Sequence, residues 1–108
     1  MKRARFALAV AVSALVCAGI SGYAQVQVEL GARQFAVTCA GCHGADGSGS
    51  LKGPAIGSLA KTVARSDDEL IRIVRDGVPG KGMPPAKALG DEKVAALVRY
   101  LRVLQLRA

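Results

Sequence analysis

The chain has 108 residues, with 15 Lys or Arg, 8 Asp or Glu and a formal net charge of +7. This length allows one small domain and excludes a multidomain protein. Aromatic residues make up 4% of the sequence and Trp is absent, so aliphatic side chains or a non-protein group must supply much of the core.

The N-terminal segment predicts a cleaved secretory signal. Residues 1–5 are basic, residues 6–20 form an uncharged apolar run, and small residues follow at Gly22 and Ala24. This order is typical of a signal cleaved after Ala24. The apolar run is shorter than the roughly 20 residues of a spanning helix. Because no charged residue appears from Phe6 to Val28, a retained signal that anchors the protein to a membrane remains the alternative.

Cleavage would divide the chain into a signal of residues 1–24 and a mature domain of residues 25–108. Loss of three basic residues leaves 12 basic and 8 acidic residues, a net charge of +4. Such a mildly basic surface does not indicate a nucleic-acid-binding protein. Cys17 would leave with the signal, so only Cys39 and Cys42 would remain. We expect a periplasmic protein that is not integral to the membrane, in a compartment that tolerates oxidised cysteines.

Helical periodicity in the mature chain predicts an all-α domain of three to five helices. Residues 26–39 carry apolar or small side chains at helical spacing, and a short helical turn is expected within residues 56–63. A glycine-rich loop, residues 44–54, separates them. No run alternates apolar and polar side chains strictly enough to predict a strand.

Two later helices are predicted from their ends. Ser66 and Glu69 match a capping box, and the helix that they begin should end at Gly77. Residues 78–89, rich in Pro and Gly, should be irregular. Asp91 is expected to cap a last helix that runs to about Gln105. The apolar stripe of that helix consists of Val94, Leu97, Val98, Leu101 and Leu104.

The stretch CAGCH, residues 39–43, holds both remaining cysteines and the single histidine. A disulfide across so small a loop would stabilise the fold little, and a thioredoxin-like redox pair needs a βαβ unit. A zinc site needs about four ligands, and only three are present. C-x-x-C-H is the attachment signature of c-type haem. We therefore predict one covalent haem c, with thioethers from Cys39 and Cys42 and iron bound by His43.

The second axial position of the iron decides between electron transfer and an open site for gases or substrates. Met83 is the only methionine of the mature chain. It lies in a Pro- and Gly-rich loop, whereas a methionine that fills a core usually lies on an apolar stripe. We predict Met83 as the second axial ligand. The carbonyl of Pro54 is a candidate acceptor for the His43 Nδ1–H, although spacing alone favours an ordinary loop proline.

These motifs resemble those of class I cytochrome c, in particular the small bacterial periplasmic kind. The resemblance extends over residues 31–104. It rests on CAGCH, Gly53-Pro54, Gly82-Met83-Pro84, and the pairs Gly31 with Phe35 and Leu97 with Tyr100. It implies a small cytochrome c fold around one haem, close contact between the first and last helices at Gly31, a Pro54 carbonyl bonded to the proximal histidine, and Met83 as axial ligand.

Family members often bond a haem propionate through a Trp, which this chain lacks. Lys52 and Arg72 are the candidates to replace it. Lys52, Lys81 and Lys87 lie in loops expected to flank the haem, where they are either a basic rim that steers acidic redox partners or ordinary solvated lysines.

The resemblance implies a one-electron carrier that exchanges electrons with redox partner proteins and is not itself an enzyme. The main alternative is a small haem subunit bound permanently to a periplasmic dehydrogenase or reductase complex. A third possibility is an enzyme or gas sensor that uses an open distal side of the haem.

Overall fold

The computed structural model describes residues 2–108, with the side chains of residues 16–108. Its helical elements are α1 (Lys2–Thr38), α2 (Ala40–His43), α3 (Ala60–Val63), α4 (Asp67–Asp76), the 3₁₀ turn η1 (Lys87–Leu89) and α5 (Asp91–Arg107). The part of the chain so described contains no strand, only an isolated antiparallel bridge between Val78 and Met83. The predicted all-α class is confirmed.

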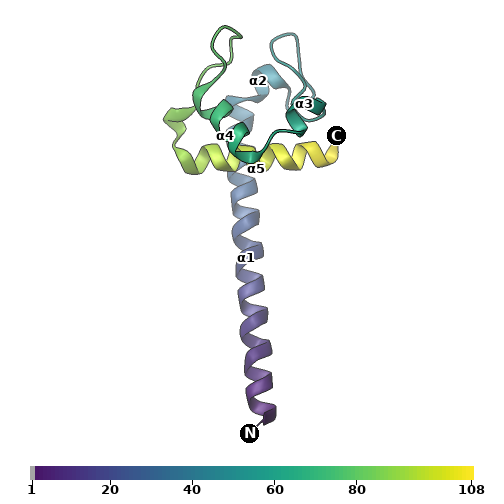
Figure 1. The fold of residues 1–108 in the computed structure, drawn as a ribbon, viewed down its shortest axis with the longest axis vertical. Helices are drawn as coiled ribbons and strands as arrows, with labels where there is room; N and C mark the ends of the chain where they lie inside the picture. Colours follow the sequence, from purple (N-terminus) through teal and green to yellow (C-terminus); the bar gives the residue numbers. More distant parts are fainter. Residues whose placement is uncertain (1) are drawn as a thin grey trace.

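The N-terminal part of helix α1, up to residue 26, forms a long stalk. The small helical domain lies at the C-terminal end of this helix (Figure 1). We expected a helix to begin at Val26, but α1 begins at Lys2 and runs without a break. Residues 2–38 contain no proline that would interrupt it. Residues 16–26 are exposed, and Gln27 is the first buried residue of the described side chains. Over the described residues, no helix is both long and apolar enough to cross a membrane. Cleavage after Ala24 stays a prediction.

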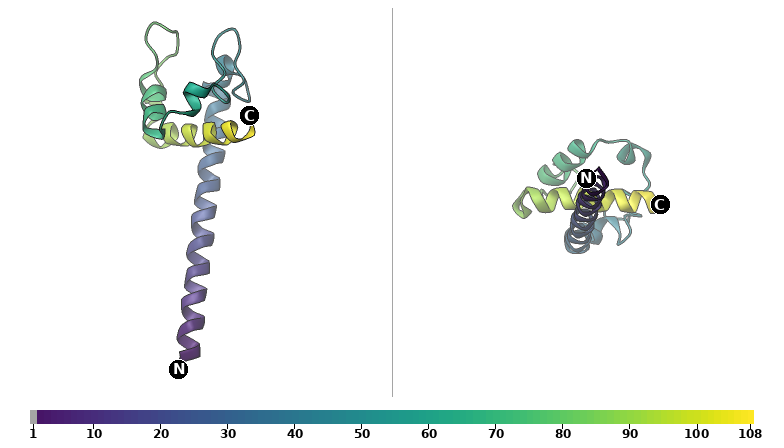
Figure 2. Two further views of the ribbon diagram at one scale, coloured as in Figure 1. Left: turned by 45° about the vertical axis from the view of Figure 1, so that its right-hand side comes forward. Right: turned by 90° about the horizontal axis from the view of Figure 1, so that it is seen from below.

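The domain is built on the crossing of α1 and α5, which lie transverse to each other (Figures 1 and 2). A Cβ at Gly31 would lie 2.1 Å from the carbonyl oxygen of Ala96, so only glycine allows this approach. One turn further on, the Phe35 and Tyr100 rings meet edge to face with centroids 5.4 Å apart. The close helix contact implied by the resemblance is thus present, and it brings the end of α1 onto the middle of α5.

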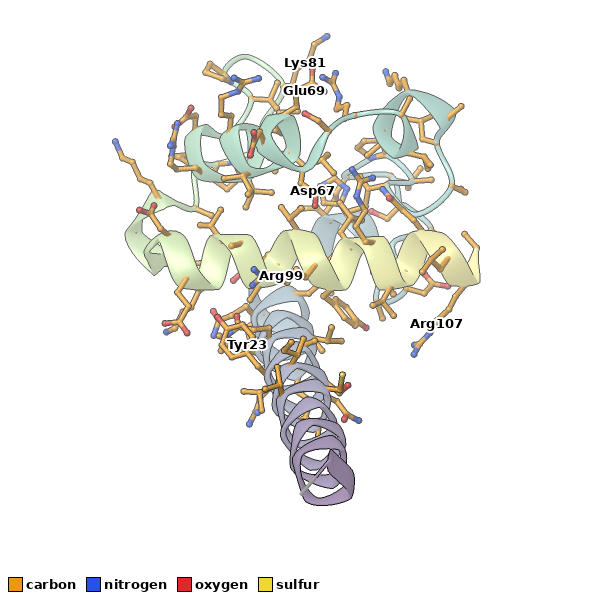
Figure 3. The ribbon with its side chains drawn as sticks, turned by 60° about the horizontal axis from the view of Figure 1, so that its bottom comes forward. Tyr23, Asp67, Glu69, Lys81, Arg99 and Arg107 are labelled. Carbon is orange, nitrogen blue, oxygen red and sulfur yellow. The ribbon has the colours of Figure 1, made fainter. Side chains whose placement is uncertain are left out.

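A polar contact joins the same two helices on the stalk side of the crossing. Gln27 is 3% exposed. Its Oε1 accepts a hydrogen bond from Arg99 at 3.2 Å, and its Nε2 donates to Glu92 Oε1 at 3.5 Å. Figure 3 shows Arg99 where α5 passes the stalk. Both ends of the buried amide are therefore satisfied, as burial requires.

Helices α4 and α5 mostly follow the sequence predictions. Both hydrogen bonds of the capping box between Ser66 and Glu69 are present at the start of α4, and the helix is followed by Gly77. All five residues of the predicted apolar stripe of α5 are buried. The cap of α5 was predicted wrongly: Gly90 occupies the N-cap with φ 86°, which glycine adopts without strain, and Asp91 is the first helical residue. There the Asp91 carboxylate still interacts favourably with the helix dipole.

The helices leave two irregular segments, residues 44–59 and residues 77–86. Both rise at the end of the molecule opposite the N-terminus, on two sides of the domain (Figures 1 and 2). The first follows α2 directly, and the second follows α4 directly. The fold therefore places the predicted haem-attachment stretch and the loop of Met83 at the same end of the domain.

Candidate haem site

The CAGCH stretch is a single tight helical turn at the end of α1. The backbone N–H of Cys39 bonds to Phe35, and the carbonyl oxygen of Cys39 accepts from Cys42 at 3.2 Å and from His43 at 3.0 Å. Gly44 then ends the turn with φ 82°. This hydrogen bonding fixes Cys39, Cys42 and His43 relative to one another on one turn of backbone. Both cysteines are free thiols.

The imidazole of His43 is 8% exposed and hydrogen-bonded. Its Nδ1 lies 2.9 Å from the carbonyl oxygen of Pro54. A carbonyl only accepts, so Nδ1 carries the proton and donates, which leaves Nε2 as the free lone pair of the ring. The hydrogen bond expected between His43 and the Pro54 carbonyl is thus present.

Small residues allow the Gly53-Pro54 pair to lie against the helical turn of residues 39–43, which we call the proximal turn. A Cβ at Gly53 would come within 3.0 Å of the Cys42 carbonyl oxygen and 3.1 Å of His43 Nδ1. A Cβ at Gly49 would come within 2.8 Å of the Ala55 backbone nitrogen. The glycines of the segment therefore serve close packing of backbone over the histidine, as well as turn formation.

The two thiols differ in environment. Cys39 is half-buried and packs against the cluster of Phe35, Leu97 and Leu104, whereas Cys42 is exposed. Burial, with a smaller contribution from the Cys42 charge, raises the pKa of Cys39 to about 11. Ser50 Oγ donates to the Cys42 carbonyl oxygen at 2.6 Å and accepts from the Lys52 backbone, which holds the start of the next segment against this cysteine.

Met83 lies in a closed loop that is fastened to α4. The Val78 N–H donates to the Met83 carbonyl oxygen at 3.0 Å, and the Ala86 N–H donates to Val74 at 3.0 Å. The Met83 side chain is half-buried. The loop therefore has a defined shape although it contains no regular structure beyond the single bridge.

The glycines of this loop differ in what surrounds them. A Cβ on Gly80 or on Gly82 would meet no protein atom within 4 Å. Both have φ 79°, so their role is to allow the turn. The close approach is at Gly77, where a Cβ would lie 2.6 Å from the Met83 carbonyl oxygen. Sequence reasoning assigned Gly77 only to the helix end.

Sequence reasoning missed a network at the far end of α5. Arg102 donates to Asp67 at 2.8 Å, to Gln105 at 2.7 Å, and to two backbone carbonyl oxygens, one at the end of α3 and one between α3 and α4. Gln105 in turn donates to the Ile56 carbonyl oxygen at 3.2 Å. Figure 3 shows Asp67 between α4 and α5. The only signal of this network in the sequence was that two polar residues three positions apart, Arg102 and Gln105, lie beside the apolar stripe of α5.

The remaining predicted residues are basic and exposed: Lys52, Arg72, Lys81 and Lys87. Lys81 is at the tip of its loop, far from the stalk (Figure 3). A shallow pocket of about 430 Å³ lies elsewhere, between residues 45–48 and the C-terminal end of α5. None of the predicted haem-binding residues lines that pocket.

The residues of the proximal turn fit a covalently attached haem. Two free thiols on one helical turn match its two vinyl groups, and a histidine whose Nδ1 is already bonded offers Nε2 to iron. An all-α domain with this set of donors is a cytochrome c domain.

Comparison with known protein families agrees. The chain matches the family model described as cytochrome c oxidase, cbb3-type, subunit III over residues 26–101, and it belongs to this family of cytochrome c domains. No curated protein matches it. A cytochrome c domain carries covalent haem c with its iron and serves haem-based electron transfer.

Proposed function

We propose that this protein is a periplasmic, monohaem c-type cytochrome that carries single electrons between redox partner proteins, with His43 and Met83 as axial iron ligands. The observation that carries the proposal is the 2.9 Å contact between His43 Nδ1 and the Pro54 carbonyl oxygen. It makes a buried histidine next to two free thiols a pre-oriented ligand. A single C-x-x-C-H stretch supports one haem.

Each residue of the proximal side has a defined role in this proposal. Cys39 and Cys42 provide the thioether links, and His43 provides Nε2 to the iron. The Pro54 carbonyl fixes the plane of the ring and raises its basicity through the Nδ1–H. Haem c, when bound, supplies an iron that alternates between the ferric and ferrous states.

Met83 is proposed to complete the coordination from the opposite loop. Its thioether is a soft ligand that favours ferrous iron and raises the reduction potential. Three backbone features support this role: the Val78–Met83 bridge, the Ala86–Val74 bond and the close packing at Gly77. A ligand loop held in this way would change little between the two oxidation states.

The experiment that tests the ligand set is spectroscopy of the haem-loaded protein and of Met83→Ala. The wild type is expected to be six-coordinate and low-spin, with the methionine-to-ferric charge-transfer band. Met83→Ala should lose the band, acquire an open site and bind carbon monoxide readily. Lys81→Ala, in the same loop and exposed, is the matched control and should keep the band.

A wild-type protein that binds carbon monoxide without displacing a ligand would contradict the Met83 assignment and favour an enzyme or gas sensor. A charge-transfer band that survives in Met83→Ala would contradict Met83 as the ligand, without favouring an enzyme or gas sensor. Export and cleavage are tested separately, by measuring the mass of the mature protein. This mass should correspond to a chain that begins at Gln25.

A second candidate is a permanent haem subunit of a larger redox complex. The observation that favours it is the family description, which names a subunit of an oxidase; the sequence had suggested a dehydrogenase or reductase complex as the host. Purification from native membranes and periplasm distinguishes the two. A stable complex would support the subunit, and a free monomer would support the carrier.

A further inference from the structure

We propose that Gln105, held by Arg102, is a positioning residue for the proximal histidine. It would act through the segment of residues 53–58, which presents the Pro54 carbonyl to His43 Nδ1. The inference rests on the proposed role of His43 as iron ligand, and it adds a distant residue of α5 to the determinants of that ligand's geometry.

The segment that carries Pro54 has little structure of its own. Its backbone bonds lead to neighbouring irregular backbone: Ser50 to Gly53 at 2.9 Å, and Gly57 to Gly47 at 3.0 Å. Leu59 bonds back to Ala55 at 3.3 Å. None of these bonds reaches a long helix, so they alone cannot fix the position of the segment relative to the core.

Ile56 connects the segment to the core. Its side chain packs against both buried clusters, the one around Leu97 and the one around Leu101. Its carbonyl oxygen accepts the 3.2 Å hydrogen bond from Gln105 Nε2. Ile56 lies two residues after Pro54, so an anchor at its carbonyl limits how far the short stretch of backbone that carries the Pro54 carbonyl can shift.

The Gln105 amide is itself held in one orientation. Arg102 Nη1 donates to Gln105 Oε1 at 2.7 Å, and because arginine only donates, the amide oxygen must face Arg102 and the NH₂ must face Ile56. Arg102 is in turn held by Asp67 at 2.8 Å and by the Val63 carbonyl oxygen at 3.1 Å. Both side chains are half-buried, which limits competition from water.

Loss of the Gln105 contact should therefore loosen the Pro54 carbonyl and weaken its bond with His43. A weaker Nδ1–H bond makes the imidazole a poorer donor to ferric iron and so raises the reduction potential. It also exposes the Nδ1 proton to solvent exchange. The free energy of one ordinary hydrogen bond, about 1 kcal/mol, sets the upper limit of this acceleration at about fivefold.

The test uses the haem-loaded, full-length protein and three variants. Gln105→Ala removes both contacts, whereas Gln105→Glu keeps an acceptor for Arg102 and places a carboxylate oxygen, which cannot donate, against the Ile56 carbonyl oxygen. Gln27→Ala is the matched control, because it also deletes an amide that bridges α5 to another element but makes no contact with residues 53–58. NMR of the ferrous state measures Nδ1–H exchange of His43, and voltammetry measures the potential.

Both Gln105 variants are expected to exchange the His43 Nδ1 proton faster than the wild type, by up to about fivefold, and Gln105→Ala should also have a raised potential. Gln27→Ala should keep the wild-type exchange rate. A wild-type rate in Gln105→Glu, or an equal acceleration in Gln27→Ala, would overturn the inference. The proposed function is judged separately, from the axial-ligand spectrum of the unmutated protein.

Discussion

At Gly31, an added methyl group would lie 2.1 Å from the Ala96 carbonyl oxygen and 2.8 Å from Tyr100 Cβ. Gly31 has a helical backbone, in which alanine would otherwise be favoured by roughly 1 kcal/mol. The glycine is thus explained by sterics rather than by its backbone angles. It sets how closely the two longest helices approach, and through them where the proximal turn lies.

Gly31→Ala is expected to lower the free energy of unfolding by about 1–3 kcal/mol or more, because the helices must separate and the Phe35–Tyr100 contact must loosen. Urea unfolding of the haem-loaded protein measures the change. Gly22→Ala in the full-length chain is the matched control: it lies in the same helix, and its added Cβ meets nothing within 4 Å. Equal stability of Gly31→Ala and the wild type would refute the steric explanation.

Among the elements, α4 has the best-defined beginning. Glu69 N–H donates to Ser66 Oγ at 3.2 Å, while the Glu69 carboxylate accepts from the Ser66 N–H at 2.8 Å. These bonds to Ser66 lower the pKa of Glu69. Since the folded pKa lies below the unfolded one, the contribution of the carboxylate is complete above the unfolded pKa and is lost as the pH falls through the folded pKa.

Ser66→Ala should therefore reduce the free energy of unfolding by about 1 kcal/mol at pH 7. The difference from the wild type should narrow slightly in acid, because protonated Glu69 accepts less strongly from the Ser66 hydroxyl at 3.3 Å, a bond that the alanine variant lacks at every pH. Denaturant titrations at several pH values measure both effects. Ser58→Ala, at an exposed loop position outside a helix start, should be neutral; an equal loss there would contradict the capping explanation.

The whole molecule consists of a packed domain and an exposed stalk, with overall extents of 68 × 28 × 22 Å. The stalk exposes apolar side chains, including Val16, Ile20 and Tyr23. Packing begins only at Gln27, where the amide joins Arg99 and Glu92. The predicted cleavage after Ala24 would thus remove the stalk and leave every contact of Gln27 in place.

A chain that begins at Gln25 is expected to unfold at the same denaturant concentration as the full-length haem protein. A chain that begins at Val28 should be less stable, because Arg99 and Glu92 lose the buried amide between them. Circular dichroism during denaturant titration provides the comparison. A marked loss of stability on removing residues 1–24 alone would show that the stalk belongs to the folded domain.

The sequence by itself determined the helical class, the haem-attachment stretch, the capping box of α4 and the apolar stripe of α5. These features depend on local rules: the spacing of side chains along a helix, the hydrogen bonds of a helix end, and the order of cysteines and histidine on one turn. The assignment of Met83 as ligand also came from sequence and awaits spectroscopy.

Only the tertiary structure decided which residues act on that stretch from a distance. It placed the Pro54 carbonyl as the acceptor for His43, packed Gly77 against the backbone of Met83, and brought Gln105 to Ile56. Such contacts join residues many positions apart. They depend on how irregular segments settle against packed helices, and no periodicity in the chain encodes that arrangement.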